Sequence, residues 1–308
     1  MKAITLQDYK QRLLRVLVHI QQQLDEPLSL EELARLAHFS PFHFHRMFKG
    51  MLGESVQSHI RRLRLERSAA RLKSGDWPVT RIALDSGFET PEAFTRAFKA
   101  MFGTSPTRYR SSRRPPRPPR GRPVASGIHY HESSRLRHFK AARFGDEDMN
   151  VTIQTMPSRR MAFVHHVGPY ATCSTAWDTL GVFLGKEGLL GGDSLVIGIC
   201  HDDPEVTPPD RIRYDACVTV DDKFMPQGEI GVQTIPGGEY AVTTHSGSYE
   251  TLGESYARLL GQWLPRSGRE LRSTPCLEIY LNDPNSTAPE DLLTDIHVPL
   301  QSAKKEHP

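Results

Sequence analysis

The chain of 308 residues contains only four cysteines, and their arrangement limits the chemistry that we expect of it. No two of them form a Cys-x-x-Cys pair, which argues against a structural zinc site. Isolated cysteines are typical of reduced thiols in a cytoplasmic protein. We therefore expect neither a metal site nor a disulfide. The four residues are Cys173, Cys200, Cys217 and Cys276.

Other features are also missing. The sequence has no apolar run long enough to span a membrane, and its first 25 residues form an amphipathic pattern without the apolar core of a signal peptide. It has no glycine-rich phosphate loop, since the glycines at 188, 191 and 192 read as a turn. We therefore expect a cytoplasmic protein with no membrane partner, no cofactor and no catalytic residue.

Charge is nearly balanced overall, at +3, but it is unevenly distributed. Residues 1–123 contain 23 Lys and Arg against 11 Asp and Glu, so this part carries +12 and the remainder −9. A solvated, mixed surface would not separate the two signs so sharply. The separation indicates a part that binds a polyanion, followed by an acidic part that does not.

An internal repeat dominates the basic part. Residues 33–56 recur as residues 82–106, and two copies separated by a connector indicate a doubled helix-turn-helix. In each copy a short amphipathic helix is followed by a tight turn and by a second helix, which a hydroxyl residue and a proline begin. The pairs that begin it are Ser40-Pro41 and Thr90-Pro91.

Helical spacing divides each second helix into a buried and an outward face. In the first copy Phe44, Met47, Phe48 and Met51 should face the core. In the second copy the corresponding buried stripe is Phe94, Ala97, Phe98 and Met101. The polar and basic residues opposite would then face the major groove of DNA. Those outward residues are Phe42, His45, Arg46 and Lys49, and Glu92, Thr95, Arg96 and Lys99.

A single helix should connect the two copies, from Val56 to Lys73, with a length of about 27 Å at 1.5 Å per residue. That length would place two reading helices about one duplex turn apart, ~34 Å. Arg61, Arg62 and Arg64 lie on the span between them. One copy alone would fit an ordinary helical hairpin equally well, but two similar copies favour DNA binding.

These stretches, Leu30–Lys49 and Ile82–Arg110, resemble the two halves of an AraC/XylS-family DNA-binding domain. The resemblance covers about a third of the chain. It implies two helix-turn-helix units inserted into adjacent major grooves. Adding the basic residues beside them, the candidate DNA contacts are Phe42, His45, Arg46, Lys49, Arg61, Pro91, Glu92, Thr95, Arg96 and Lys99.

Arginine and proline dominate residues 110–123, with six and five respectively, which is typical of an extended or disordered linker. The remainder is doubled at an offset of 79 to 80, so that Val151–Pro157 matches Ile230–Pro236. Each half predicts two strands, a helix and two more strands. The helices should cover about 172–186 and 250–264, and the later strands about 195–201, 214–220, 276–282 and 294–300.

The second part, roughly 149–301, resembles the GyrI-like small-molecule-binding domain, through motifs such as Arg213-Tyr214-Asp215 and Leu277–Pro284. The resemblance implies an aromatic pocket with a carboxylate at its floor. A buried, unpaired glutamate is costly, and a cationic ligand would remove that cost by pairing with Glu278 and stacking on aromatic rings. Pairing of Glu278 with a core arginine, or exposure to solvent, remains an alternative. The candidate ligand residues are Tyr170, Trp177, Tyr214, Glu278 and Tyr280.

We therefore expect two domains, an all-α double helix-turn-helix and an α+β antiparallel-sheet domain with an internal pseudo-twofold repeat. Their predicted bounds are 1–112 and 149–302, with an Arg/Pro-rich linker over 113–148. The predicted function is a bacterial transcriptional regulator controlled by a lipophilic or cationic small-molecule effector. Its expected partners are double-stranded DNA, the effector and, as a further candidate, RNA polymerase. Two alternatives remain open: a hydrolase using Glu278 and a tyrosine, or a domain that binds a protein such as polymerase or gyrase.

Overall fold

The computed structural model describes residues 5–112, 125–131, 136–144, 149–186, 194–204 and 206–302. The chain divides into two compact units, which are described separately. The larger unit contains residues 42–50 together with residues from 144 onward. The other consists of residues 7–41 and 51–143. The predicted linker core, residues 113–124, lies outside the described residues.

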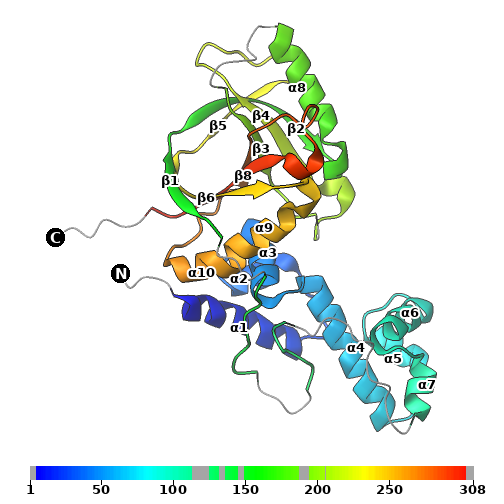
Figure 1. The fold of residues 1–308 in the computed structure, drawn as a ribbon. Helices are drawn as coiled ribbons and strands as arrows, with labels where there is room; N and C mark the ends of the chain where they lie inside the picture. Colours follow the sequence, from blue (N-terminus) through cyan, green and yellow to red (C-terminus); the bar gives the residue numbers. More distant parts are fainter. Residues whose placement is uncertain are drawn as a thin grey trace, which may run out of the picture. The chain divides into compact units, whose positions relative to one another are not determined.

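The smaller unit is helical. It contains α1 (Leu6–Gln22), α2 (Leu30–Leu36), α4 (Val56–Ser74), α5 (Val79–Asp85), α6 (Pro91–Phe102) and α7 (Pro106–Ser111) (Figure 1). The predicted connector helix is thus present as α4, one residue longer than expected. Phe94, Phe98 and Phe102 of α6 pack with Tyr109 of α7 around one core. The second predicted buried stripe is therefore confirmed, with Ala97 and Met101 at its edge.

Both tight turns of the repeat require a left-handed backbone. His38 has φ of 55° and Gly87 has φ of 73° at the turns that follow α2 and α5. Thr90 then caps α6 by accepting a hydrogen bond from the backbone N–H of Ala93 at 3.1 Å. The predicted hydroxyl cap at Ser40 is not formed, since its Oγ is buried without a hydrogen-bond partner among the described residues.

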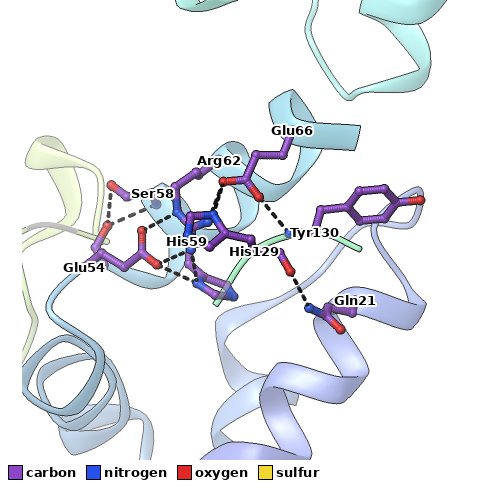
Figure 2. A network of polar contacts seen from close by, with 9 residues as sticks. Gln21, Glu54, Ser58, His59, Arg62, Glu66, His129 and Tyr130 are labelled. Atoms are coloured by element: carbon purple, nitrogen blue, oxygen red, sulfur yellow. Dashed lines mark hydrogen bonds and ion pairs between the residues drawn. The ribbon is translucent and has the colours of Figure 1, made fainter. Parts of the chain in front are cut away.

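A polar network fixes the segment after residue 124 to α4 (Figure 2). Arg62 donates to Glu54 at 2.6 Å and to Glu66 at 2.8 Å. Glu66 in turn accepts from the backbone N–H of Tyr130 at 2.7 Å. Residues 125–131 and 136–143 thus belong to the helical unit, where they bury Ile128, Phe139 and Ala142. The domain bounds expected from the sequence stay a prediction.

An eight-stranded antiparallel sheet forms the larger unit, in the order β1-β6-β8-β7-β3-β4-β2-β5. From either edge the order runs from a short strand through two longer ones to a short one, and the internal pseudo-twofold repeat stays a prediction. The sheet curves strongly around one of its faces (Figure 1). Its strands are β1 (Thr152–Met156), β2 (Arg159–Val167), β3 (Val196–Cys200), β4 (Arg213–Thr219), β5 (Gly231–Ile235), β6 (Gly238–Ser246), β7 (Cys276–Tyr280) and β8 (Leu293–Pro299).

Helices cover one face of this sheet, as predicted for an α+β domain. They are α8 (Ser174–Lys186), α9 (Leu252–Arg258) with its continuation through the π-helical turn Leu259–Trp263, and α10 (Leu264–Ser267). α8 packs on β2 and β4 through Leu180 and Leu184. The opposite face has an apolar core of its own, to which Leu277 and Ile279 contribute. Leu277 and Ile279 of β7 thus lie on the face opposite to the one that the helices cover.

A further helix of the larger unit comes from far earlier in the chain. Residues 42–50 of α3 (Pro41–Leu52), the second helix of the first repeat, belong to this unit. Gly50 meets the π-helical turn at Gly261, where a Cβ on Gly261 would lie only 2.1 Å from the Gly50 carbonyl carbon. Two glycines thus allow the two helix backbones to touch.

Candidate ligand-binding and DNA-binding sites

The helix-covered face of the sheet carries a cluster of aromatic side chains, here called the cage. It consists of Tyr170, Trp177, Tyr214, Tyr249, Tyr256 and Tyr280 around Glu278. Tyr170 and Trp177 come from the segment leading into and through α8, Tyr256 from α9, and Tyr214, Glu278 and Tyr280 from β4 and β7. The structure thus brings together all five of the ligand residues expected from the sequence.

Hydrogen bonds order the cage around the carboxylate of Glu278, which is 7% exposed. Tyr256 donates to Oε1 at 3.1 Å and Tyr280 donates to Oε2 at 3.0 Å. Because the Tyr280 proton is used in this bond, its oxygen accepts from Tyr214 at 2.9 Å. Tyr214 accepts in turn from the indole N–H of Trp177 at 3.1 Å. One directed chain of donors therefore ends on Glu278.

The middle of the sheet leaves room for these hydroxyl groups because β3 has a glycine there. A Cβ on Gly198 would lie 2.5 Å from the Tyr214 hydroxyl oxygen and 2.6 Å from that of Tyr280. Any larger residue would push both tyrosines away from Glu278. Gly198 is thus part of the site, although it has no side chain to contact a ligand.

Burial and the Glu278 charge keep the tyrosines protonated. Desolvation raises the pKa of Tyr256 and of Tyr280 well above the usual range, and the negative charge of Glu278 raises it further. A thiol at the site is also kept protonated, since burial raises the pKa of Cys276 to about 11. The cage therefore presents neutral hydrogen-bond donors and one carboxylate, surrounded by π faces.

Arg46 of α3 contacts this cage from within the same unit. Its guanidinium carbon lies 3.9 Å from the ring centroid of Tyr256, a cation–π contact, and its side chain is 11% exposed. Desolvation by burial lowers its pKa, but interactions with Tyr256, Cys276 and Asp203 outweigh that effect and the net shift is upward. Arg46 is thus a charged side chain stacked on a ring whose hydroxyl is bonded to Glu278.

Asp203 anchors the same turn of α3. His45 and Asp203 form a 2.9 Å hydrogen bond, and the Arg46 Nε lies 3.7 Å from the same carboxylate. The sequence-based expectation that His45 and Arg46 face outward is therefore wrong for this structure, where His45 is 1% exposed. Amphipathic spacing identified the buried Phe44 and Phe48, but it could not show that the opposite face of α3 also packs against protein.

The second repeat differs in this respect. On α6, Glu92, Arg96 and Lys99 are exposed, and Pro91 and Thr95 are half-buried. Within the described residues, neither the Arg96 nor the Lys99 side chain forms an ion pair. The outward face expected from the sequence is therefore present on α6, where the basic residues Arg96 and Lys99 are exposed.

Comparison with known proteins relates both parts of the chain to established families. Residues 33–112 match the helix-turn-helix domain family, and residues 149–301 match the GyrI-like small molecule binding domain. The chain is 36% identical over 95 residues to the multiple antibiotic resistance protein MarA of Salmonella typhimurium, which is 31% of this chain and 75% of MarA. It belongs to the AraC-type family of helix-turn-helix regulators.

Two further relatives are each similar to about a third of this chain. The right origin-binding protein of Escherichia coli K12 is 40% identical over 97 residues, 32% of this chain and 34% of the relative. The probable transcriptional regulator YgiV of the same strain is 34% identical over 109 residues, 35% of this chain and 68% of YgiV. The alignment thus spans about a third of the length of the right origin-binding protein.

For an AraC-type regulator the connector between the two helix-turn-helix repeats is of interest, and two of the three α4 arginines expected to lie on its span are used internally. Arg62 is bonded to Glu54 and Glu66, and Arg64 donates to the backbone oxygens of Leu24 and Glu26. Arg61 alone is exposed, with its guanidinium 5.5 Å from the Phe88 ring. This distribution leaves Arg61 as the connector arginine available to a phosphate.

Sequence reasoning missed Tyr256, Tyr249 and Gly198 in the GyrI-like part. Tyr249 was visible, since His245–Tyr249 matches the repeat motif of His166–Tyr170. Tyr256 was not, because on a helix read alone it is indistinguishable from a core residue. Only the packing of α9 on β7 brings its hydroxyl to Glu278.

A cavity of about 720 Å³ lies between β6 and α9. Its lining is polar, with residues such as Thr243, His245 and Arg258, and includes no tyrosine, tryptophan or phenylalanine. It therefore lacks what a lipophilic cation requires. Within the described ranges there is no helix capable of spanning a membrane, and no group of three His, Cys, Asp or Glu arranged to hold a metal ion.

Proposed function

We propose that this AraC-type protein is a sequence-specific DNA-binding transcriptional regulator whose GyrI-like part binds a cationic, aromatic or lipophilic small molecule. The observation that carries the proposal is the bonded carboxylate of Glu278 within the cage. A buried charge requires a partner, and the two tyrosine hydroxyls give it only neutral donors. A cation stacked on the rings would complete the site.

The proposed DNA contacts are those expected from the sequence. Arg96, Thr95 and Glu92 of α6 would contact bases, because the first turns of a recognition helix enter the major groove. Lys99 and Arg61 would contact phosphates. The corresponding residues of α3, namely His45, Arg46 and Lys49, would act in the same way once their helix is available. Phe42 and Pro91 complete the proposed set.

We also propose that the cage binds its ligand without converting it. A hydrolase would need an activated nucleophile or base, but the tyrosines are held protonated and both Glu278 oxygens accept hydrogen bonds. The buried thiols have raised pKa values, which makes them poor nucleophiles. RNA polymerase is the proposed protein partner and the cytoplasm the proposed location, as a DNA-bound regulator requires.

Titration calorimetry on the full chain tests the ligand part of this proposal. The ligands are benzyltrimethylammonium and its uncharged carbon isostere, neopentylbenzene. Glu278→Gln removes the charge at nearly constant volume, so it should weaken the cation and spare the neutral compound. Equal losses for both compounds would assign Glu278 a structural role only. Selection of bound duplexes from random DNA, with and without the cation, tests the DNA part.

A further inference from the structure

Three features of α3 show that its contact with the cage is specific rather than incidental. Arg46 stacks on Tyr256 at 3.9 Å, a distance well within the range of a cation–π interaction. His45 and Arg46 share the carboxylate of Asp203. His43 is buried and hydrogen-bonded through Nε2 to the carbonyl oxygen of Arg272 at 3.1 Å. Three residues of this helix, His43, His45 and Arg46, thus have polar or cation–π partners in the larger unit.

Glycines on both sides allow this contact. A Cβ on Gly50 would lie 2.5 Å from the carbonyl oxygen of Ala257, and one on Gly261 would lie 2.1 Å from the carbonyl carbon of Gly50. Neither obstacle is a flexible side chain, so neither could move aside cheaply. The backbone of α3 therefore fits this position only because both residues lack a side chain.

The second repeat serves as an internal comparison. Arg96 is the counterpart of Arg46 and is exposed, whereas Arg46 is nearly covered. Ala100 stands where the first repeat has Gly50, and Thr95 where it has His45. The first repeat therefore differs from the second at positions that contact Asp203 or the π-helical turn, while both repeats keep the arginine expected to contact DNA.

We propose that Arg46 is an internal ligand of the cage, so that a cationic effector and helix α3 compete for one site. This rests on the proposed function, and it adds both the ligand class and the direction of regulation. In the form seen here Arg46 stacks on Tyr256 of the cage and His45 is buried against Asp203, so neither side chain can contact bases. A cation that stacks on Tyr256 displaces the Arg46 guanidinium, weakens the hold on α3, and releases the first reading helix for DNA.

Population arithmetic gives the size of the effect. When a competing internal state holds a site, the apparent affinity for an outside ligand falls by the fraction of molecules in which the site is open. If α3 is held in about nine molecules of ten, removing the competition strengthens cation binding on the order of tenfold. Cation binding should raise DNA affinity by a comparable factor, because linkage between the two equilibria is reciprocal.

The test is the affinity of the full chain for tetraphenylphosphonium, measured by titration calorimetry. Gly261→Ala places a methyl group against the Gly50 backbone, and Gly50→Ala places one against α9, so each should release α3 and raise cation affinity on the order of tenfold. Arg46→Ala should do the same by removing the internal cation. Gly253→Ala is the matched control on α9, since a Cβ there meets nothing within 4 Å, and it should bind as the wild type does.

DNA binding by the two glycine variants provides the second readout. Gly261→Ala and Gly50→Ala should bind the selected duplex more tightly than the wild type without ligand, and tetraphenylphosphonium should add little. Gly253→Ala should respond to the cation as the wild type does. Gly50→Ala introduces the alanine that the second repeat has at the same position, Ala100, so α3 of this variant should still be able to bind DNA.

The outcomes separate the two proposals. If wild type, Gly261→Ala, Gly50→Ala and Arg46→Ala all bind the cation with equal affinity, Arg46 does not compete, and the inference is overturned while ligand binding stands. If neither the wild type nor Arg46→Ala binds the cation, the proposed function itself is wrong. Tighter binding by the three variants, with Gly253→Ala unchanged, supports both.

Discussion

At the residue scale, the two counterpart arginines show how surroundings decide the use of a side chain. Arg46 and Arg96 occupy the same position in the repeat, but Arg46 stacks on Tyr256 and faces Asp203, whereas Arg96 is exposed on α6. A buried guanidinium needs these partners to offset its desolvation. An exposed one keeps its donors for a ligand such as the edge of guanine.

Arg96 should therefore contribute to sequence specificity. We expect Arg96→Ala to weaken specific DNA binding by about 1–3 kcal/mol and to relax the preference at one base pair. Lys99→Ala, the control from the same face, should weaken all sequences alike and reduce the salt dependence of binding. Binding-site selection with each variant measures both effects. An unchanged selected site for Arg96→Ala would contradict the assignment of the reading face.

The buried imidazole of His297 should make the stability of the larger unit depend on pH. Burial lowers the pKa of His297 from 6.5 to about 4, an effect that the nearby charge of Asp295 only partly offsets. The folded state thus favours the neutral ring, so its contribution is fully present above pH 6.5 and is lost as pH falls toward 4. At pH 5 the expected loss is about 2 kcal/mol.

His297→Phe isolates this effect, because His43 and the other titratable groups remain in both proteins. The difference in unfolding free energy between wild type and variant should change by about 2 kcal/mol between pH 7.5 and pH 5, in favour of the variant at the lower pH. Urea unfolding at the two pH values measures it. A difference that stays constant with pH would show that His297 does not take up a proton on unfolding.

At the element scale, two neighbouring arginines of α4 differ in their surroundings: one is bonded within the protein and the other is exposed to solvent. Arg62 is bonded to two carboxylates, and Glu54 has a pKa lowered to about 2 because hydrogen bonds from His59 and Arg62 outweigh the desolvation that would raise it. Arg61 next to it is exposed. Neighbours on the same helix thus have opposite expected roles.

Substituting these two neighbours should separate stability from DNA affinity. Arg62→Ala leaves two part-buried carboxylates without their shared donor and should cost about 1–3 kcal/mol of unfolding free energy. Arg61→Ala should leave stability unchanged, weaken DNA binding for all sequences, and lower the slope of log affinity against log salt by about 1. Chemical unfolding and salt-dependent DNA titrations measure these. Equal destabilisation by both variants would contradict the assignment of Arg62 to stability and of Arg61 to DNA binding.

Sequence patterns predicted elements well where the determining interactions are local. The connector was expected over Val56–Lys73 and occurs as Val56–Ser74, and the Thr90-Pro91 cap starts α6 as expected. The strand expected at about 276–282 occurs as β7, Cys276–Tyr280. These features depend on periodicity and on capping by neighbouring residues, which a single sequence displays.

Contacts between distant residues could not be predicted in this way. Tyr256 reaches Glu278 only through the packing of α9 on the sheet, and Arg46 lies more than 200 residues from Tyr256 in the chain. Nothing in the spacing of α3 distinguishes a face that contacts DNA from one that contacts protein, since a basic and aromatic face suits both. The glycine pair Gly50 and Gly261 has meaning only once the two helices are seen to touch.

At the scale of the whole molecule, the uneven charge fits the proposed roles of the two parts, DNA binding for the basic part and effector binding for the acidic part. The part up to residue 123 carries +12 and the rest −9. α3 is the exception, because it is encoded in the basic part but lies in the unit of the acidic part. A cationic effector would thus displace the same helix, α3, that a polyanionic duplex binds.

This coupling leads to a prediction about how the operator is read. Without effector, α6 alone should read bases, so base changes in its half-site should cost about 1–3 kcal/mol each, while changes in the half-site for α3 should cost little. With tetraphenylphosphonium, base changes in either half-site should weaken binding.

The 19 residues of α4 span about 28 Å, which suits half-sites one duplex turn apart. Inserting five base pairs between them rotates one half-site to the opposite side of the duplex, and should therefore abolish the cation-induced gain while leaving ligand-free affinity unchanged. Quantitative footprinting of the wild type on the parent duplex and on the three altered duplexes distinguishes the cases. Ligand-free binding that already requires both half-sites would show that α3 reads DNA without any release.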